Sequence, residues 1–219
     1  VAEREAAWVS VGRPGREVAA TMGPSLAALQ PRGEIGLVDG ILVIGAASRD
    51  GTAEIAQRHG ARVVQESAVL PQFGPCRGKG DAMWRALAVT TGAVVAYIDA
   101  DTREFDARFA LGLIAPLVVD SEIALVKGAF RRPLQAGGAL LADEGGRVTE
   151  LVARPLLSMV APELGGFVQP LAGQTAGRRH LLAGLAFPAA YGVEIALLIH
   201  ALPPRGLPAL PPCHPRRPP

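Results

Sequence analysis

The stretch Ala93-Val94-Val95-Ala96-Tyr97-Ile98-Asp99-Ala100-Asp101 decides the fold of this chain. Its first six residues form a short apolar, β-rich run of the kind that becomes a buried strand, and two carboxylates follow with one residue between them. Ligands of an open α/β sheet bind just beyond the carboxyl ends of its strands. Two carboxylates there would suit a divalent cation that itself holds a diphosphate. The competing interpretation is a plain strand-end turn, where aspartate is common.

Apolar runs alternate with helix-like stretches through the first two thirds of the chain. The expected strands are 8–11, 40–44, 61–65, 93–98 and 124–130. The expected helices are 18–29, 52–59, 79–90, 109–118 and 147–157. Pro116 within the fourth of these is a local signal that favours an earlier end. This alternation predicts an α/β fold with a mainly parallel, Rossmann-like sheet flanked by helices. Because crossovers in such sheets are right-handed, the loops at 45–52, 74–81 and 99–103 should meet at one edge.

Composition narrows the class of protein. With 219 residues, 49% of them hydrophobic, the chain can bury one sizeable core. A formal net charge of +2 and 5% aromatic residues argue against a nucleic-acid partner. The apolar runs at 111–119 and 195–202 are too short to span a bilayer, and the N-terminal residues do not resemble a signal peptide. Cys76 and Cys213 lie far apart without metal-ligand spacing, so we expect a cytoplasmic protein with no membrane partner.

We expect a single domain over residues 1–202 and a proline-rich tail over residues 203–219. The tail lacks the apolar periodicity that packing needs, so it should be extended or disordered, with its arginines in solvent.

Three motifs outside the Asp-Ala-Asp stretch carry chemistry. Arg77-Gly78-Lys79-Gly80-Asp81 places a lysine between glycines just before a helix, where the backbone can approach a phosphate. Gly146-Arg147-Val148-Thr149-Glu150 offers a glycine turn, a guanidinium and a hydroxyl to an anion, although it also reads as a simple helix start. Tyr191-Gly192-Val193-Glu194 puts a phenol and a carboxylate at the start of an apolar helix, suited to sugar hydroxyls or to helix entry alone.

Taken together, these segments resemble the glucosyl-3-phosphoglycerate synthases and the related mannosyl-3-phosphoglycerate synthases, which are retaining glycosyltransferases of the GT-A fold. The resemblance covers about residues 38–200. Its motifs are Arg-Gly-Lys-Gly-Asp-Ala-Met-Trp-Arg-Ala-Leu at 77–87, Asp99-Ala100-Asp101, Leu125-Val126-Lys127 leading to Phe130-Arg131-Arg132-Pro133, the run Gly145-Gly146-Arg147-Val148-Thr149-Glu150-Leu151-Val152-Ala153-Arg154-Pro155-Leu156-Leu157, Gln169-Pro170-Leu171, and Tyr191-Gly192-Val193-Glu194-Ile195.

The resemblance implies a role for each motif. Asp101 would bind Mg²⁺ or Mn²⁺ bridging the donor diphosphate, and Tyr191 and Glu194 would position the transferred sugar. The remaining donor-binding residues would be Pro14, Ser48, Lys79, Asp99 and Ala100. Gly146, Arg147 and Thr149 would hold the phosphate and carboxylate of 3-phosphoglycerate. No catalytic base is assigned, because the family retains configuration without a firmly assigned protein nucleophile.

The implied activity is transfer of glucose from UDP-glucose, or another NDP-sugar, to 3-phosphoglycerate. About residues 1–133 would form the nucleotide-sugar half and residues 134–202 the acceptor half. Family members are often dimers, so a homodimer is an expectation of the same kind.

Two other functions stay open from the residues. The loop Gly45-Ala46-Ala47-Ser48-Arg49-Asp50 lacks an aspartate and a serine of the family's pattern. The family's downstream metal-binding histidine has no clear counterpart, and whether His214 of the tail takes its place stays open. These departures fit a homologue that binds a phosphorylated acid without turnover. A nucleotidyltransferase is the third hypothesis, because a Gly-Lys-Gly loop and metal-binding acids suit that chemistry as well.

Overall fold

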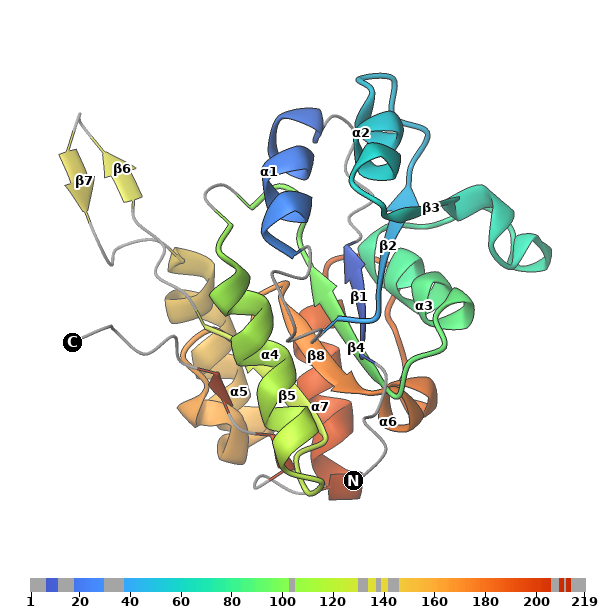
Figure 1. The fold of residues 1–219 in the computed structure, drawn as a ribbon. Helices are drawn as coiled ribbons and strands as arrows, with labels where there is room; N and C mark the ends of the chain where they lie inside the picture. The colour runs from blue at the N-terminus through green and yellow to red at the C-terminus, as the bar shows by residue number, and fades with distance from the viewer. Residues whose placement is uncertain are drawn as a thin grey trace.

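A mixed seven-stranded sheet forms the centre of the molecule (Figure 1). The structure is a computed structural model that describes residues 7–11, 18–29, 38–102, 105–129, 134–136, 139–141, 146–205, 209–210 and 212–213. The sheet has the order β3-β2-β1-β4-β8-β5-β9. Its strands are β1 (Ala7–Val11), β2 (Gly40–Gly45), β3 (Arg62–Gln65), β4 (Val94–Ile98), β5 (Leu125–Gly128), β8 (Thr175–Arg178) and β9 (Pro212–Cys213).

One strand of the sheet runs against the others. β8 is antiparallel to both β4 and β5, whereas β1, β2, β3 and β4 pair in parallel, as do β5 and β9. The register places Tyr97, Thr175 and Lys127 opposite one another across β4, β8 and β5. Residues directly opposite in adjacent strands share one face of a sheet, so these three side chains leave the sheet on the same side.

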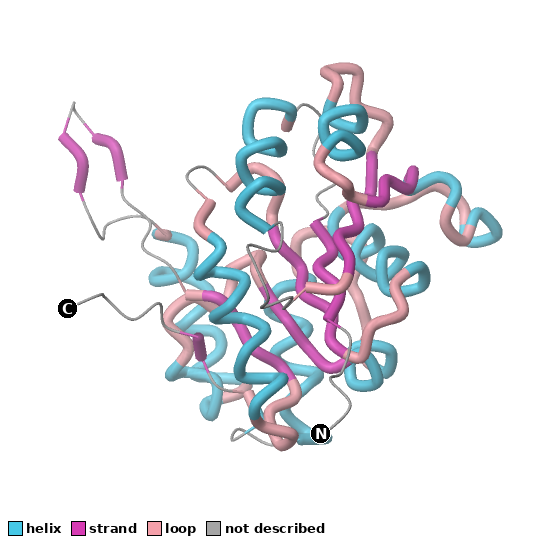
Figure 2. The backbone as a smooth tube through the Cα atoms, viewed as in Figure 1, coloured by secondary structure: helices cyan, strands magenta, loops and turns pink. Residues whose placement is uncertain are grey.

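Helices cover both faces of the sheet, as the tube in Figure 2 shows. The helices are α1 (Ala19–Leu29), α2 (Thr52–Arg58), α3 (Lys79–Val89), α4 (Ala107–Val119), α5 (Arg154–Val160), α6 (Arg179–Gly184) and α7 (Val193–Arg205). A π-helical turn, Thr149–Ala153, leads directly into α5, and short 3₁₀ turns occupy Glu66–Ala68, Pro71–Phe73 and Pro162–Gly166. β6 (Leu134–Ala136) and β7 (Ala139–Leu141) form a separate antiparallel ribbon that stands away from the sheet in Figure 1.

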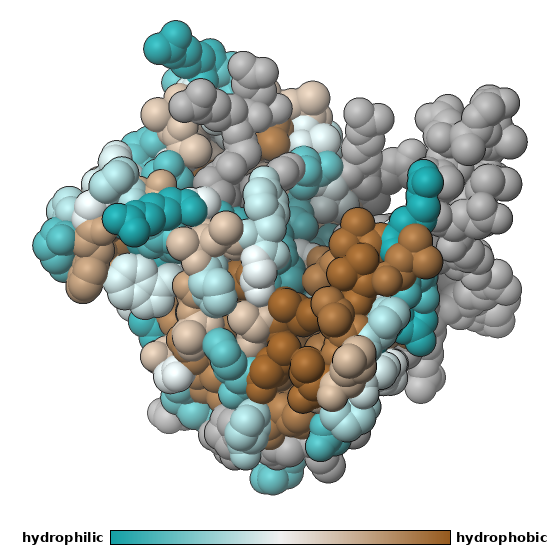
Figure 3. Space-filling view, turned by 180° about the vertical axis from the view of Figure 1, so that it is seen from behind, coloured by the Kyte–Doolittle hydropathy of each residue, from teal (hydrophilic) through white to brown (hydrophobic). Residues whose placement is uncertain are grey.

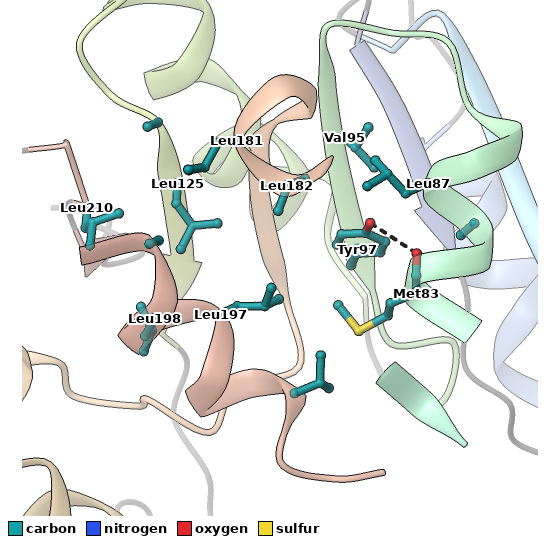
Figure 4. Packing of buried hydrophobic residues seen from close by; sticks show 14 of the residues in the cluster. Met83, Leu87, Val95, Tyr97, Leu125, Leu181, Leu182, Leu197, Leu198 and Leu210 are labelled. Atoms are coloured by element: carbon teal, nitrogen blue, oxygen red, sulfur yellow. Dashed lines mark hydrogen bonds between the residues drawn. The ribbon is translucent and has the colours of Figure 1, made fainter. Parts of the chain in front are cut away.

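Two apolar layers hold these elements together. On one face, Met22 and Leu26 of α1, Ala56 of α2 and Leu113 of α4 pack on β2, β4 and β5 through residues such as Val94. On the other face, α3, α6 and α7 pack together, with Leu87, Leu182 and Leu197 meeting Tyr97 and Leu125 of the sheet (Figure 4). The Tyr97 hydroxyl in this layer donates to the Met83 carbonyl at 3.2 Å, so its burial leaves no unsatisfied donor.

Several of the large exposed apolar side chains lie in the segment 148–160, and others lie elsewhere in the described residues. Those of the segment include Val148, Leu151, Leu156 and Met159, of which Met159 is 79% exposed. The space-filling view from behind shows a hydrophobic area on the surface (Figure 3). No helix in the described ranges is both long enough and apolar enough to cross a membrane.

Most of the expected elements are confirmed. The helix expected over 109–118 is α4, which continues past Pro116 to Val119 because Pro116 removes only one helical bond while Leu117 remains buried in the core. Residues after 203 are not simply an unpacked tail, since α7 runs to Arg205, Leu210 is buried and β9 pairs with β5. The sheet also contains β8 and β9, which the sequence did not predict.

Candidate active site

The carboxyl ends of β2 and β4 lie at the same edge of the sheet, because both strands are parallel to β1 between them. The start of α1 is bound to the segments that follow these strands. Asp50 Oδ2 accepts a bond of 2.9 Å from the backbone N of Ala19, and the Thr21 hydroxyl donates to the carbonyl of Ala100 at 2.7 Å. The predicted gathering of these loops is therefore confirmed for the residues that the structure describes.

Lys79 is the centre of the site. It begins α3, and its Nζ lies 2.8 Å from Asp99 Oδ1 and 2.8 Å from Glu194 Oε1. Burial alone would lower the pKa of Lys79, but the carboxylates of Asp99 and Glu194 outweigh it and raise that pKa above its ordinary value. Lys79 is therefore a fixed cation near neutral pH. It joins a residue just after β4 to a residue in the first turn of α7.

The glycines around Lys79 serve a different purpose from the one the sequence suggested. The backbone N–H groups of Gly80 and Asp81 donate to the carbonyl of Ala189, at 3.0 and 3.4 Å. A Cβ on Gly80 would overlap the carbonyl of Pro188, so only glycine admits this close approach. The first turn of α3 is thus packed against the protein's own backbone. The N–H groups of Gly80 and Asp81 are therefore occupied by the protein's own backbone, and phosphate binding by this motif stays a prediction.

A second glycine borders the ion pair from the other side. Gly173 precedes β8, and a Cβ there would overlap the carboxylate of Asp99 and lie 2.5 Å from Lys79 Nζ. The next residue, Gln174, donates from Nε2 to the Thr102 hydroxyl at 3.4 Å. The segment before β8 therefore closes over the loop that carries Asp99 and Asp101.

Asp101 is the residue best placed to hold a cation. It follows β4 and is exposed, two residues after the Asp99 carboxylate that Lys79 holds. Within the described ranges no group of three His, Cys, Asp or Glu side chains could bind a metal by itself. Mg²⁺ and Mn²⁺ that travel with a diphosphate need only one or two protein carboxylates, since phosphate and water oxygens complete the shell. The residues present therefore fit a metal that arrives with a nucleotide diphosphate.

The acceptor residues predicted from the sequence form a second group. Gly146 has φ of 95°, and its carbonyl accepts from the backbone N of Thr149 at 2.8 Å and of Glu150 at 3.2 Å. Arg147 is exposed, whereas Thr149 is buried at the start of the π-helical turn. π-helical turns are rare in proteins overall, and those that occur are frequently found at functional sites. The Glu150 carboxylate pairs at 2.9 Å with the guanidinium of Arg154, four residues later, on the exposed side of the π-helical turn.

The other predicted donor residues lie in different environments. Glu194 is 7% exposed and Tyr191 is 74% exposed, although both flank the start of α7. Ser48 is half-buried in the loop after β2. Pro14 lies outside the described residues, as does Gly145 of the acceptor motif.

Sequence reasoning missed three participants in this site. Gly173 and Ala189 act only through backbone proximity, which no local pattern reveals. Lys127 was quoted within a motif but given no role, although a single lysine in the apolar run 124–130 is a usable signal.

A mainly parallel sheet carrying acidic residues and a lysine at the carboxyl edge, with an antiparallel strand inserted beside β4, defines a glycosyltransferase of the GT-A fold. No protein-family model matches the chain. It is 45% identical over 203 residues to the glucosyl-3-phosphoglycerate synthase of Mycolicibacterium smegmatis, covering 91% of this chain and 67% of that protein. The chain belongs to the glucosyl-3-phosphoglycerate synthase family.

Two solved structures support the same assignment. The mannosyl-3-phosphoglycerate synthase from Rubrobacter xylanophilus superposes with a TM-score of 0.83 at 40% identity, over 95% of this chain and 64% of that one. The glucosyl-3-phosphoglycerate synthase from Mycobacterium tuberculosis, in complex with Mn²⁺, UDP and glucosyl-3-phosphoglycerate, gives 0.82 at 39% identity, over 98% and 73%. The chain spans about two thirds of the length of the curated relatives it matches.

Proposed function

We propose that the chain transfers glucose from UDP-glucose to 3-phosphoglycerate with retention of configuration and with Mg²⁺ or Mn²⁺ as cofactor. The observation that carries this proposal is the ion-pair cluster of Lys79, Asp99 and Glu194 beside Asp101. The carboxylates of Asp99, Glu194 and Asp101 outnumber the single ammonium of Lys79, so the site carries a formal negative charge. Such a site attracts a divalent cation together with its diphosphate. The relatives with these names, and the M. tuberculosis complexes with Mn²⁺, UDP-glucose and phosphoglyceric acid, support the same substrates.

The proposed roles follow from position and charge. Asp101 would hold the metal, which stabilises charge on the leaving diphosphate when bound. Lys79 and Asp99 would contact the nucleotide, and buried Glu194 would orient sugar hydroxyls. Ser48, Ala100 and Tyr191 complete the proposed donor site, with Pro14 outside the described residues.

The acceptor would be held by Gly146, Arg147 and Thr149. A guanidinium binds phosphate or carboxylate oxygens bidentately, and Gly146, with its positive φ, begins the turn that carries Arg147 and Thr149. We propose residues 134–202 as the acceptor half and residues 1–133 as the nucleotide-sugar half. The two halves share one sheet, since β8 of the second half lies between β4 and β5 of the first.

We also propose a cytoplasmic setting, which the free thiol of Cys76 supports. The homodimer stays a prediction.

The test is calorimetric titration of the protein with UDP-glucose, with and without Mn²⁺, alongside an assay for UDP release. We expect metal-dependent donor binding, and UDP release only when 3-phosphoglycerate is present. The Asp101→Asn variant should lose the metal dependence while keeping its fold. Donor binding that is indifferent to Mn²⁺, or a folded protein with no transfer, would refute the proposal.

A second function is favoured by one observation in the loop after β2. The backbone N–H of Ala47 donates to Gln65 Oε1 at 3.1 Å, and Ala47 has φ of 53°, so this loop is held by its own neighbours in a conformation unusual for alanine. A homologue that binds 3-phosphoglycerate without turnover fits such a loop. Acceptor binding without donor binding in the same titration would establish it.

A further inference from the structure

Lysine is rare in this chain, and the lysine side chains contact one common residue. The sequence contains 20 arginines but only two lysines, Lys79 and Lys127. Both amino groups converge on Glu194: Lys79 pairs with its carboxylate at 2.8 Å, and Lys127 Nζ donates to its backbone carbonyl at 3.3 Å. The two lysines, whose amino groups are compact and titratable, therefore both contact Glu194, in a chain whose other basic side chains outside histidine are arginines.

Lys127 connects the sheet to the helix that carries Glu194. It lies in β5 and is 2% exposed, and its Nζ also donates to the Thr175 hydroxyl of β8 at 3.0 Å. The apolar layer around it, with Leu125 of β5 and Leu197 of α7, is seen in Figure 4. A single buried amino group therefore joins β5, β8 and the first turn of α7.

Holding the backbone of Glu194 also sets the direction of its side chain. Glu194 is the second residue of α7, where the helix has no preceding turn to fix it. With its carbonyl held by Lys127 and its carboxylate held by Lys79, Glu194 is secured at both ends. A carboxylate that must meet a substrate gains affinity when it is oriented in advance.

The charge of Lys127 depends on pH in the neutral range. Complete burial lowers the pKa of Lys127 to about 7, with Glu194 of α7 and Asp99 after β4 opposing the shift and Lys79 of α3 adding to it. Thr175 of β8, its other partner, does not titrate in this range. An arginine could not lose its proton in this pH range.

We propose that Lys127 is a positioning residue of the donor site, which holds the first turn of α7 so that the Glu194 carboxylate meets Lys79 and the incoming sugar nucleotide. This inference rests on the proposed function, because it assigns Glu194 to the donor. When Lys127 loses its proton, its hydrogen bond to the Glu194 carbonyl is no longer charge-assisted, the hold on the first turn of α7 weakens, and the donor binds less well.

The first experiment compares the Lys127→Met variant with the wild type, by titration with UDP-glucose and Mn²⁺ between pH 6 and pH 8.5. Arg178→Met is the matched control. Like Lys127, Arg178 of β8 is a buried cation, but its guanidinium donates to the carbonyls of Ile123, Leu117 and Asp120 and not to Glu194. We expect Lys127→Met to raise the donor Kd at least tenfold and to abolish the weakening of affinity above pH 7. Arg178→Met should lower stability and leave both the Kd and its pH profile unchanged.

Each alternative outcome has a distinct meaning. Equal donor affinity and an equal pH profile for Lys127→Met and wild type would overturn the positioning role and leave the proposed function intact. If neither protein binds UDP-glucose, the proposed function fails and takes the donor-site role of Lys127 with it. A crystal structure of Lys127→Met then decides the structural part of the inference, that Lys127 holds Glu194 against Lys79. Glu194 still 2.8 Å from Lys79 in that structure would overturn this part as well, whereas a displaced Glu194 would support it.

A second measurement needs no folded Lys127 variant. Protein labelled with ¹³C at lysine Cε gives two lysine side-chain signals, assigned with the Lys79→Arg variant. We expect one signal to titrate near neutral pH and to shift when UDP-glucose is added with Mn²⁺. Two signals that both titrate above pH 10 would overturn the inference.

Discussion

Gly173 gives the sharpest test of the site, because its missing side chain leaves room for the ion pair. In a Gly173→Ala variant the new Cβ would lie 2.5 Å from Lys79 Nζ, whereas ordinary contacts begin at 3.4 Å, so the ammonium must move by about 0.9 Å. The Asp99 carboxylate, which the Cβ would overlap, must move further. An ion pair of 2.8 Å does not survive such a displacement as a hydrogen bond. We expect a loss of about 1–3 kcal/mol in unfolding free energy.

Donor binding should suffer by a similar amount. A displaced charged hydrogen bond is worth about 2 kcal/mol, which corresponds to a rise of roughly 30-fold in the Kd for UDP-glucose. The assays are urea unfolding and calorimetric titration in the presence of Mn²⁺. Gly184→Ala is the matched control, since a Cβ at that position meets nothing within 4 Å. A Gly173→Ala protein that matches the control in both assays would refute the steric argument.

Three further changes test other parts of the structure. Ala47→Gly should raise the unfolding free energy by about 0.5–1 kcal/mol in urea unfolding, because Ala47 has φ of 53°; a loss of stability would contradict the strained loop. Arg85→Met should cost about 3–5 kcal/mol and expose residues 66–78 to protease, because buried Arg85 pairs with Asp81 and donates to the carbonyls of Val69 and Gly74. An unchanged cleavage pattern would count against that role. Since the pKa of Lys127 is lowered to about 7 in the folded state, its contribution to stability should rise with pH between 7 and the ordinary 10.5, at no more than about 1.4 kcal/mol per pH unit. The difference between the unfolding free energies of wild type and Lys127→Met at successive pH values measures this slope, and a difference that falls as pH rises would refute it.

Local patterns predicted the elements that meet in the first half of the sheet. The run 93–98 became β4, and the glycine-flanked Lys79 became the first residue of α3, because both depend on short-range apolar periodicity and helix-start signals. β8 escaped prediction because Thr-Ala-Gly-Arg has no apolar alternation and contains a glycine. Its place between β4 and β5 depends on pairings that are distant in sequence.

The same distinction holds for the site. The acidic pair after β4 and the lysine of α3 were recognisable from residue type and position. That Glu194 would meet Lys79 from 115 residues further along the chain, or that Ala189 would take the N–H groups of α3, depends on tertiary packing. Pro116 shows the reverse case, in which core burial of Leu117 outweighed a local helix-breaking signal.

The antiparallel strand inserted between β4 and β5 affects the order in which the molecule can assemble. β1 to β4 can pair as soon as they leave the ribosome, but β5 has no neighbour in the sheet until residues 175–178 arrive, about 50 residues later. During that interval the edge of β4 is an open template for another chain, which makes the half-synthesised protein prone to aggregation. Closing that edge is also the step that brings Gly173 over Asp99, whereas Glu194, the other partner of Lys79, and β9, the last strand of the sheet, leave the ribosome only afterwards.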